Sequence, residues 1–370
     1  MRKNKNNETD LPLTISSKDG LVDQISFFNK TVASKDMSGY YLLMNGEYAY
    51  NKSYSVGYDF GSIKRLERYP MGALSTLYIC FALKRYNSDF IKTYFDSLKW
   101  YKEIYMISAE GARNHGLLNV PTDEFFDTYH YLTNNVAEQS KIATLMGLVE
   151  QRIEKQQALV DNLKKYKRGA TNNIFNGYTF NESVKECLLS DVASFHQGLT
   201  YSPGDVSDMG YLVMRSSNIQ NGRLSFRDNV YVKSRISESL LVQENDVLMC
   251  VRNGSKQLVG KTAIIDQAYP NMTWGAFMMI IRSTLKNTFV YHYLNSDSFY
   301  NQVFRDSGTA TINQITKGTL NECKLFIPNS EQQERICQYL DLLDRKLHKE
   351  EDYLENLRLL KQSLLQKLFI

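Results

Sequence analysis

The sequence predicts an α+β fold in which two mixed α/β domains each precede one long amphipathic helix, as a pseudo-two-fold internal repeat. Its 370 residues give room for two domains of ordinary size. Two segments with helical periodicity align without a gap, and strand-like runs precede each segment in the same order. The predicted boundaries are 1–135 for the first domain, 136–178 for its helix, 179–329 for the second domain and 330–370 for the second helix.

The helical repeat joins residues 138–175 to residues 332–369 at an offset of 194. Glu150 aligns with Asp344, which is a conservative pair. The identical pairs include Gln139/Gln333, Ile142/Ile336, Leu163/Leu357, Lys167/Lys361 and Phe175/Phe369.

Each of these segments has one narrow apolar seam, because its apolar residues recur at steps of three or four. One matching seam position is polar in both copies, Gln156 and Glu350, and such a residue can set the register of paired helices. A long, narrow seam favours helix–helix pairing over the alternative, in which each helix packs only on its own domain. The predicted helix-pairing residues are Ile142, Met146, Val149, Ile153, Gln156, Val160, Leu163, Ile336, Leu340, Leu343, Leu347, Glu350, Leu354 and Leu357.

The domains themselves show a looser repeat of strand-like runs and turns. The second half also has a lead-in, residues 184–210, before its first matching run, whereas only ten residues precede the matching run of the first half. The first domain therefore lacks about twenty residues that its own repeat suggests. The matching runs are 11–17 and 211–217, 40–52 and 240–252, and 74–81 and 274–281.

Composition indicates a folded protein of the cytoplasm. The chain is 43% hydrophobic and 23% charged, and it shows neither a secretory leader nor an apolar run of about 20 residues. Five scattered cysteines without a framework indicate reduced thiols. The net charge of +4 is only mildly basic, so a DNA partner requires clustered positive charge or a contribution from another subunit.

Catalytic motifs are absent from the sequence. Residues 254–262, GSKQLVGKT, resemble a phosphate-binding loop, but their glycines enclose five residues instead of four and a strand pattern follows, which favours a basic hairpin loop. The five histidines have no metal-ligand spacing. Residues 344–346, Asp-Arg-Lys, imitate part of a nuclease motif, but we place them on a solvated helix face. We therefore expect no catalytic residue, no metal and no cofactor in this chain.

Two segments resemble a known family, the specificity subunits of Type I restriction–modification systems. The more specific one is the duplicated helix, EQSKIATLMGLVEQRIEKQQALVDNLKKYKRG followed by NIF, with its echo ending LLQKLF. The other is YYLLMNGEYAYNKSYSVGYDFGSIKRL, which looks like a target-recognition domain of that family.

The resemblance implies two target-recognition domains separated by two antiparallel coiled-coil helices. Each domain would read one half of a split double-stranded DNA sequence, and the helices would set the spacing of the halves. The implied subunit has no catalytic activity and binds two methyltransferase subunits, which hold S-adenosylmethionine and associate with translocating restriction nuclease subunits.

Candidate DNA contacts come from polar and basic loops of both halves. Arginine pairs well with guanine and asparagine or glutamine with adenine, while lysine and arginine also contact phosphates. The alternative for any single loop is a solvated turn. The candidates are Asn51, Lys52, Ser53, Tyr54, Lys64, Arg65, Arg113, Asn114 and His115 in the first half, and Arg215, Ser216, Ser217, Asn218, Arg252, Asn253, Ser255, Lys256, Gln257, Thr309, Thr311, Asn313 and Gln314 in the second.

Two other functions stay open at this point. One is a DNA-modifying or DNA-cleaving enzyme whose carboxylates are far apart in the sequence. The other is a coiled-coil assembly scaffold without a DNA role.

Overall fold

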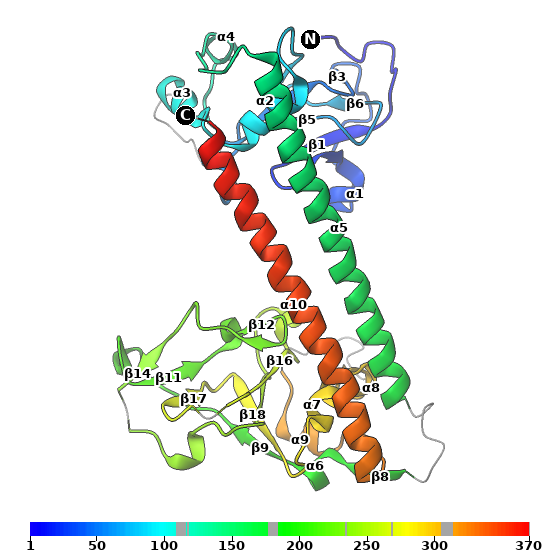
Figure 1. The fold of residues 1–370 in the computed structure, drawn as a ribbon, viewed down its shortest axis with the longest axis vertical. Coiled ribbons are helices and arrows are strands. Elements are labelled where there is room, and N and C mark those ends of the chain that lie inside the picture. The colour runs from blue at the N-terminus through cyan, green and yellow to red at the C-terminus, as the bar shows by residue number, and fades with distance from the viewer. Residues whose placement is uncertain are drawn as a thin grey trace. The chain divides into compact units, whose positions relative to one another are not determined.

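The computed structural model describes residues 1–108, 116, 118–176, 184–233, 235–267, 269–304 and 314–369. The chain forms two compact units. Unit 1 comprises Met1–Gln156 and Tyr353–Ile370, and unit 2 comprises Gln157–Asp352. The long helices α5 (Val136–Phe175) and α10 (Ser330–Leu368), green and orange to red in Figure 1, each contribute residues to both units.

Unit 1 contains two small sheets. The first has the order β2-β1-β6-β3, with β1 and β6 parallel, and the second has the order β5-β4-β7. One apolar core lies between the sheets, and a second, rich in aromatic rings, joins the second sheet to the helices. The elements are β1 (Pro12–Ser16), β2 (Gly20–Asp23), α1 (Gln24–Phe28), β3 (Tyr41–Met44), β4 (Tyr48–Asn51), β5 (Ser62–Arg65), β6 (Met71–Leu74), β7 (Ile79–Phe81), α2 (Ser88–Asp96), α3 (Tyr101–Ile107) and α4 (Thr122–Phe126).

Unit 2 contains two four-stranded sheets, β10-β14-β11-β17 and β16-β15-β18-β9, and two short strand pairs, β12-β13 and β19-β8. Strands β11 and β17 are parallel, as are β1 and β6 of unit 1. The elements are β8 (Lys185–Leu188), α6 (Leu189–Val192), β9 (Ala193–Gln197), β10 (Val206–Ser207), β11 (Tyr211–Met214), β12 (Ile219–Gln220), β13 (Arg223–Leu224), β14 (Tyr231–Val232), β15 (Val247–Cys250), β16 (Thr262–Ile264), β17 (Met272–Trp274), β18 (Met278–Ser283), α7 (Phe289–Leu294), α8 (Asp297–Phe304), α9 (Lys317–Asn321) and β19 (Lys324–Ile327).

The predicted strand runs correspond to observed strands, with one difference. Runs 11–17 and 211–217 contain β1 and β11. Runs 74–81 and 274–281 each contain the end of one strand, a turn and the start of the next, not a single strand. In the first run, Ser75 Oγ accepts a hydrogen bond from the Leu77 backbone N–H at 3.4 Å within the turn.

The seam residues of α5 and α10 are all buried or half-buried, which is what helix pairing requires. Within unit 1, Lys361 contacts Glu150 and Tyr353 contacts Arg152, so residues late in α10 lie beside residues early in α5. Within unit 2, Lys164 contacts Glu351 and Lys167 contacts Asp344. The two helix segments therefore run antiparallel inside each unit.

Candidate nucleic-acid interface

Three of the predicted polar loops of unit 2 lie together at one end of its strands. The Asn253 side-chain amide donates to Ser216 Oγ at 3.1 Å, which joins the loop after β15 to the loop after β11. Arg252 pairs with Gln314 through an isolated antiparallel bridge, and the Ile315 N–H donates to the Val251 carbonyl at 2.7 Å. We define the unit-2 loop cluster as residues 215–218, 252–257, 275–277 and 314, where the last range is the β17–β18 turn.

Unit 1 brings equivalent loops together. The Tyr54 N–H donates to the Gly116 carbonyl at 2.7 Å, and the Leu118 N–H donates to the Lys52 carbonyl at 3.0 Å. The hydroxyl groups of Ser17 and Ser55 are 2.9 Å apart, which connects the end of β1 to the loop after β4. We define the unit-1 loop cluster as residues 17–18, 51–55, 75–77 and 116, where 75–77 is the β6–β7 turn.

Exposure differs among the predicted contact residues of these clusters. Arg252, Ser255, Lys256, Gln257, Gln314 and Tyr54 are exposed, whereas Lys52, Ser53, Ser216 and Ser217 are half-buried. Asn51 and Asn253 each accept a backbone N–H two residues later, from Ser53 and Ser255, so each side chain also shapes its own turn.

Asn218 is buried and stabilises its own loop, so it is not available to contact DNA. It is 0% exposed, and its amide donates to the Ser225 and Asp228 carbonyls at 2.9 and 3.1 Å. Its oxygen accepts the Arg215 N–H at 2.9 Å, while the Arg215 guanidinium forms an ion pair with Asp228 at 2.8 Å. Asn218 is therefore corrected from a base-contact candidate to the residue that holds this loop, because its polar atoms already have partners.

Lys64 and Arg65 are a second correction, because the structure does not bring them into the loop cluster. In the β4–β5 ladder Asn51 faces Ser62 and Tyr48 faces Arg65, so Arg65 lies at the end away from the loop that follows Asn51. Lys64 forms an ion pair with Asp96 at 2.7 Å, and Arg65 pairs with Glu67 and Asp89, each at 2.6 Å. Their charges are thus compensated within unit 1.

Six predicted contact residues lie outside the described residues. They are Arg113, Asn114, His115, Thr309, Thr311 and Asn313.

The helices carry charged contacts that the seam pattern did not predict. In unit 1, Glu150 accepts from Lys361 at 2.7 Å and from Lys92 at 3.0 Å. Burial opposes the charge of Glu150, but these two lysines together lower the pKa of its carboxyl group below the usual 4.5. At the repeat offset of 194, Glu150 and Lys361 correspond to Asp344 and Lys167 of unit 2, which also form an ion pair.

Asp344 is therefore not on a solvated helix face, which corrects the sequence-based expectation. It is buried, and Lys167 compensates its charge. The repeated pairs Glu150/Asp344 and Lys167/Lys361 were the signal in the sequence, because an acid and a base recur at matching positions of both helices.

Two further repeated residues attach the helices to the domains. Phe369 packs on Phe90 and Tyr94 of α2, with ring centroids 5.5 and 5.3 Å away. Its equivalent, Phe175, packs on Phe289 and Tyr293 of α7 at 5.2 and 5.8 Å.

Equivalent glutamines attach the N-terminal ends of α5 and α10 to the domains. The Gln139 side chain accepts the Asn87 backbone N–H at 2.9 Å and donates to the Thr133 carbonyl at 2.8 Å. Gln333 accepts from the Asn287 side chain at 3.4 Å and donates to the Pro328 carbonyl at 2.8 Å. The same two helix ends are thus fastened in both units, by the same residue types.

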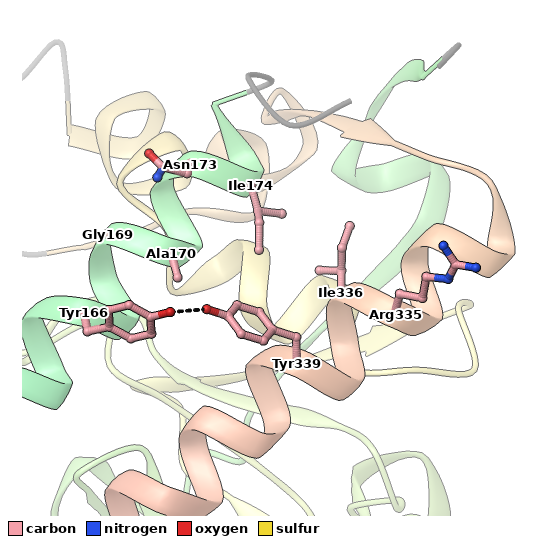
Figure 2. Close-up of a pocket in the computed structure, with 8 residues that line it drawn as sticks. All are labelled: Tyr166, Gly169, Ala170, Asn173, Ile174, Arg335, Ile336 and Tyr339. Carbon is pink, nitrogen blue, oxygen red and sulfur yellow. Dashed lines mark hydrogen bonds between the residues drawn. The ribbon is translucent and has the colours of Figure 1, made fainter. Parts of the chain in front are cut away.

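A cleft of about 580 Å³ opens between the helices inside unit 2 (Figure 2). The hydroxyl groups of Tyr166 and Tyr339 meet across it at 2.8 Å, and small residues, Gly169 and Ala170, line the α5 side. Arg335 lies at the α10 side.

Within the described ranges, no group of three or more histidine, cysteine or acidic residues is arranged to hold a metal ion. No helix among these residues has the length and apolar character needed to cross a membrane. The β15–β16 pairing shows that the phosphate-loop-like sequence is a hairpin connection, as predicted.

Known proteins share both the fold and part of the sequence. The chain has a TM-score of 0.59 to a chain from a structure on complex assembly and conformational transition of the type I R-M system, at 16% identity, covering 100% of this chain and 93% of that one. The TM-score to the Type I restriction–modification system S subunit from M. genitalium is 0.57, at 15% identity, covering 92% and 87%. The mixed helix-and-sheet fold with two long helices is therefore shared with these structures.

Sequence comparison matches the family description "Type I restriction modification DNA specificity domain" to residues 181–356. The Type I restriction enzyme StySPI specificity subunit of Salmonella potsdam is 29% identical over 165 residues, which is 42% of this chain and 35% of that protein. The EcoKI specificity subunit of Escherichia coli (strain K12) is 30% identical over 163 residues, again 42% and 35%.

The matched residues comprise most of unit 2, including its part of α10. Residues 181–356 thus match the family of Type I restriction–modification specificity domains, in agreement with the resemblance found in the sequence. The matched segment spans about a third of the length of these two relatives.

Proposed function

We propose that this chain is a non-catalytic DNA-specificity subunit of a Type I restriction–modification complex, and that each loop cluster reads one half of a bipartite site. The supporting observation is that both units gather equivalent strand-end loops into one polar cluster. The equivalent side chains are similar in type but not identical: Lys52 corresponds to Arg252, and Tyr54 corresponds to Gly254. Two related clusters with different side chains suit two different half-sites.

Base selection would come from the exposed side chains of these clusters. Arg252 can donate two hydrogen bonds to guanine in the major groove, and Gln257 or Gln314 can pair with adenine. Lysines such as Lys52 and Lys256 supply phosphate contacts that position the chain without selecting a sequence. Because the net charge is only +4, partner subunits would supply part of the phosphate binding.

The long helices would hold the two clusters at a fixed separation and dock two methyltransferase subunits. The ion pairs Glu150–Lys361 and Lys167–Asp344 support a helix pair that is fixed in register. The cleft beside Tyr166 and Tyr339 offers an apolar anchor point with a basic rim at Arg335. The docked methyltransferases would hold S-adenosylmethionine and recruit translocating nuclease subunits.

A selection experiment tests this function. The full chain, alone and with a Type I methyltransferase subunit, is incubated with a pool of random duplexes, and the retained duplexes are sequenced. We expect two short motifs separated by a fixed unselected gap. Enrichment of no motif would contradict the DNA-specificity role and favour a scaffold. Cleavage or methylation by the pure chain with Mg²⁺ and S-adenosylmethionine would favour an enzyme.

A further inference from the structure

One large apolar side chain projects from each loop cluster at an equivalent position. Leu77 is 67% exposed and Phe277 is 58% exposed. Leu77 lies in the turn from β6 to β7, and Phe277 lies in the turn from β17 to β18. These turns correspond in the two units, and their residue numbers differ by 200.

Phe277 is held directly against a predicted base-contact residue. The Arg252 guanidinium carbon lies 5.4 Å from the centroid of the Phe277 ring. The Phe277 carbonyl accepts the backbone N–H groups of Val251 and Arg252 at 3.0 and 3.2 Å. The ring therefore shares a surface with Arg252, and Gln314 is paired with Arg252 on the same loop cluster.

Leu77 lies in a turn beside the loop after β4. In the β4–β7 ladder Tyr50 faces Ile79, so the chain that continues past Asn51 leaves the sheet beside the turn containing Leu77. The next residue, Tyr78, anchors this turn to β1, since its hydroxyl group is 3.3 Å from Thr14 Oγ1. The backbone thus fixes the place of Leu77 while its side chain remains in solvent.

A single exposed apolar residue is ordinary on a protein surface. Two of them at equivalent tips, each beside polar and basic loops, indicate a shared use. Nucleic-acid bases offer apolar surface in two places: the thymine methyl group in the major groove, and the base faces at a step that an apolar side chain unstacks. Leucine and phenylalanine differ in shape, so they would suit different bases in the two half-sites.

We propose that Leu77 and Phe277 contact bases of their respective half-sites through this apolar surface and contribute to sequence selection. The inference rests on the proposed DNA-specificity function and extends it to a residue type that hydrogen-bond arguments leave out. Burial of such a side chain in the complex should change the affinity for the preferred base about tenfold or more.

The test repeats the random-duplex selection with the full chain carrying Leu77→Ala or Phe277→Ala. Each variant should lose preference at one or two positions of one half-site, a different half for each variant. Val136→Ala and Met209→Ala are matched controls, because these side chains are 71% and 75% exposed and lie away from the loop clusters. The controls should select the wild-type motif, and all four variants should melt like the wild type.

Two further measurements separate the two kinds of apolar surface. The first uses a pool with deoxyuridine in place of thymidine, which removes the methyl group. If Phe277 contacts that methyl group, the wild type should lose in this pool the same base preference that Phe277→Ala loses in the thymidine pool. An unstacked step predicts no change in that pool, but a rise in 2-aminopurine fluorescence at that step with the wild type and not with Phe277→Ala.

The inference is overturned if both variants select the wild-type motif with wild-type affinity, or if they weaken binding equally for all sequences. In either case the wild type still enriches a bipartite motif and the proposed function stands. If the wild type enriches no motif, the proposed function falls and this inference falls with it.

Discussion

Units 1 and 2 have the same residues where they attach to the long helices, but different residues in the loops that are proposed to contact DNA. Phe369 and Phe175 occupy equivalent aromatic sites, and Gln139 and Gln333 make equivalent backbone contacts. The loop clusters keep the same framework but place Lys52 where the other unit has Arg252. The residues that attach the helices are thus the same in both units, whereas the loop clusters, which are proposed to read two half-sites, differ.

The sheet edges show a further difference. In unit 2, β9 pairs with β18 from Gln197↔Met279 to Ala193↔Ser283, and β8 pairs with β19. Both β8 and β9 come from the lead-in segment 184–210, which precedes the first matching run of the second half. Among the described residues of unit 1, β7 pairs only with β4. The lead-in therefore supplies edge strands in unit 2.

Removing the aromatic residue that attaches one helix should cause the largest loss of stability. Phe369→Ala and Phe175→Ala each empty a buried aromatic site, and such a change costs about 3–5 kcal/mol. Hydrogen exchange should show lost protection mainly in β4 and β7 for the first variant, and mainly in β15 and β18 for the second. Phe→Leu at the same positions is the milder control. Equal loss in both units for either variant would mean that the two attachments are not separate.

A smaller effect is expected from the charged helix contact of unit 1. The lowered pKa of Glu150 means that its carboxylate stabilises the fold above pH 4.5, and that this stabilisation is lost as the pH falls through the lowered value. Glu150→Gln should reduce the free energy of unfolding by about 1.5–3 kcal/mol at pH 7 and flatten its decline below pH 4.5. Urea unfolding across pH measures this, with the exposed Glu154→Gln as control. A control that behaved like Glu150→Gln would contradict the specific role of this ion pair.

The smallest change is expected from single substitutions in the unit-2 loop cluster. Arg252→Ala should lose about 1–3 kcal/mol of discrimination at one position of one half-site, if Arg252 contacts guanine. Lys256→Ala, in the same exposed loop, should weaken binding to all sequences and reduce its salt dependence. Competition binding with single-base variants of the selected duplex distinguishes the two. Uniform weakening by Arg252→Ala would reassign this side chain to phosphate.

The sequence predicted the parts of the structure that depend on local pattern. Helix periodicity located α5 and α10, and the apolar runs located β1, β4, β11 and β15. Contacts between distant segments were not predictable in this way. Nothing near Lys64 and Arg65 in the sequence shows that α2 brings Asp96 and Asp89 to them, and nothing near Asn218 shows that it is enclosed by residues 225–229. The prediction that Asp344 is solvated was wrong because a charged residue on a helix usually is. Only the repeated lysine, Lys167, indicated that Asp344 has a partner.

The two units are proposed to read DNA independently of each other. Exchange of Val184–Ile327 for the same region of a relative replaces the unit-2 loop cluster and leaves the unit-1 cluster intact. Random-duplex selection, or methylation mapping in cells that carry the exchanged chain, then compares the two half-sites before and after. We predict that one half changes to that of the relative while the other half is unaltered. A change in both halves, or in neither, would show that the two units do not read DNA independently.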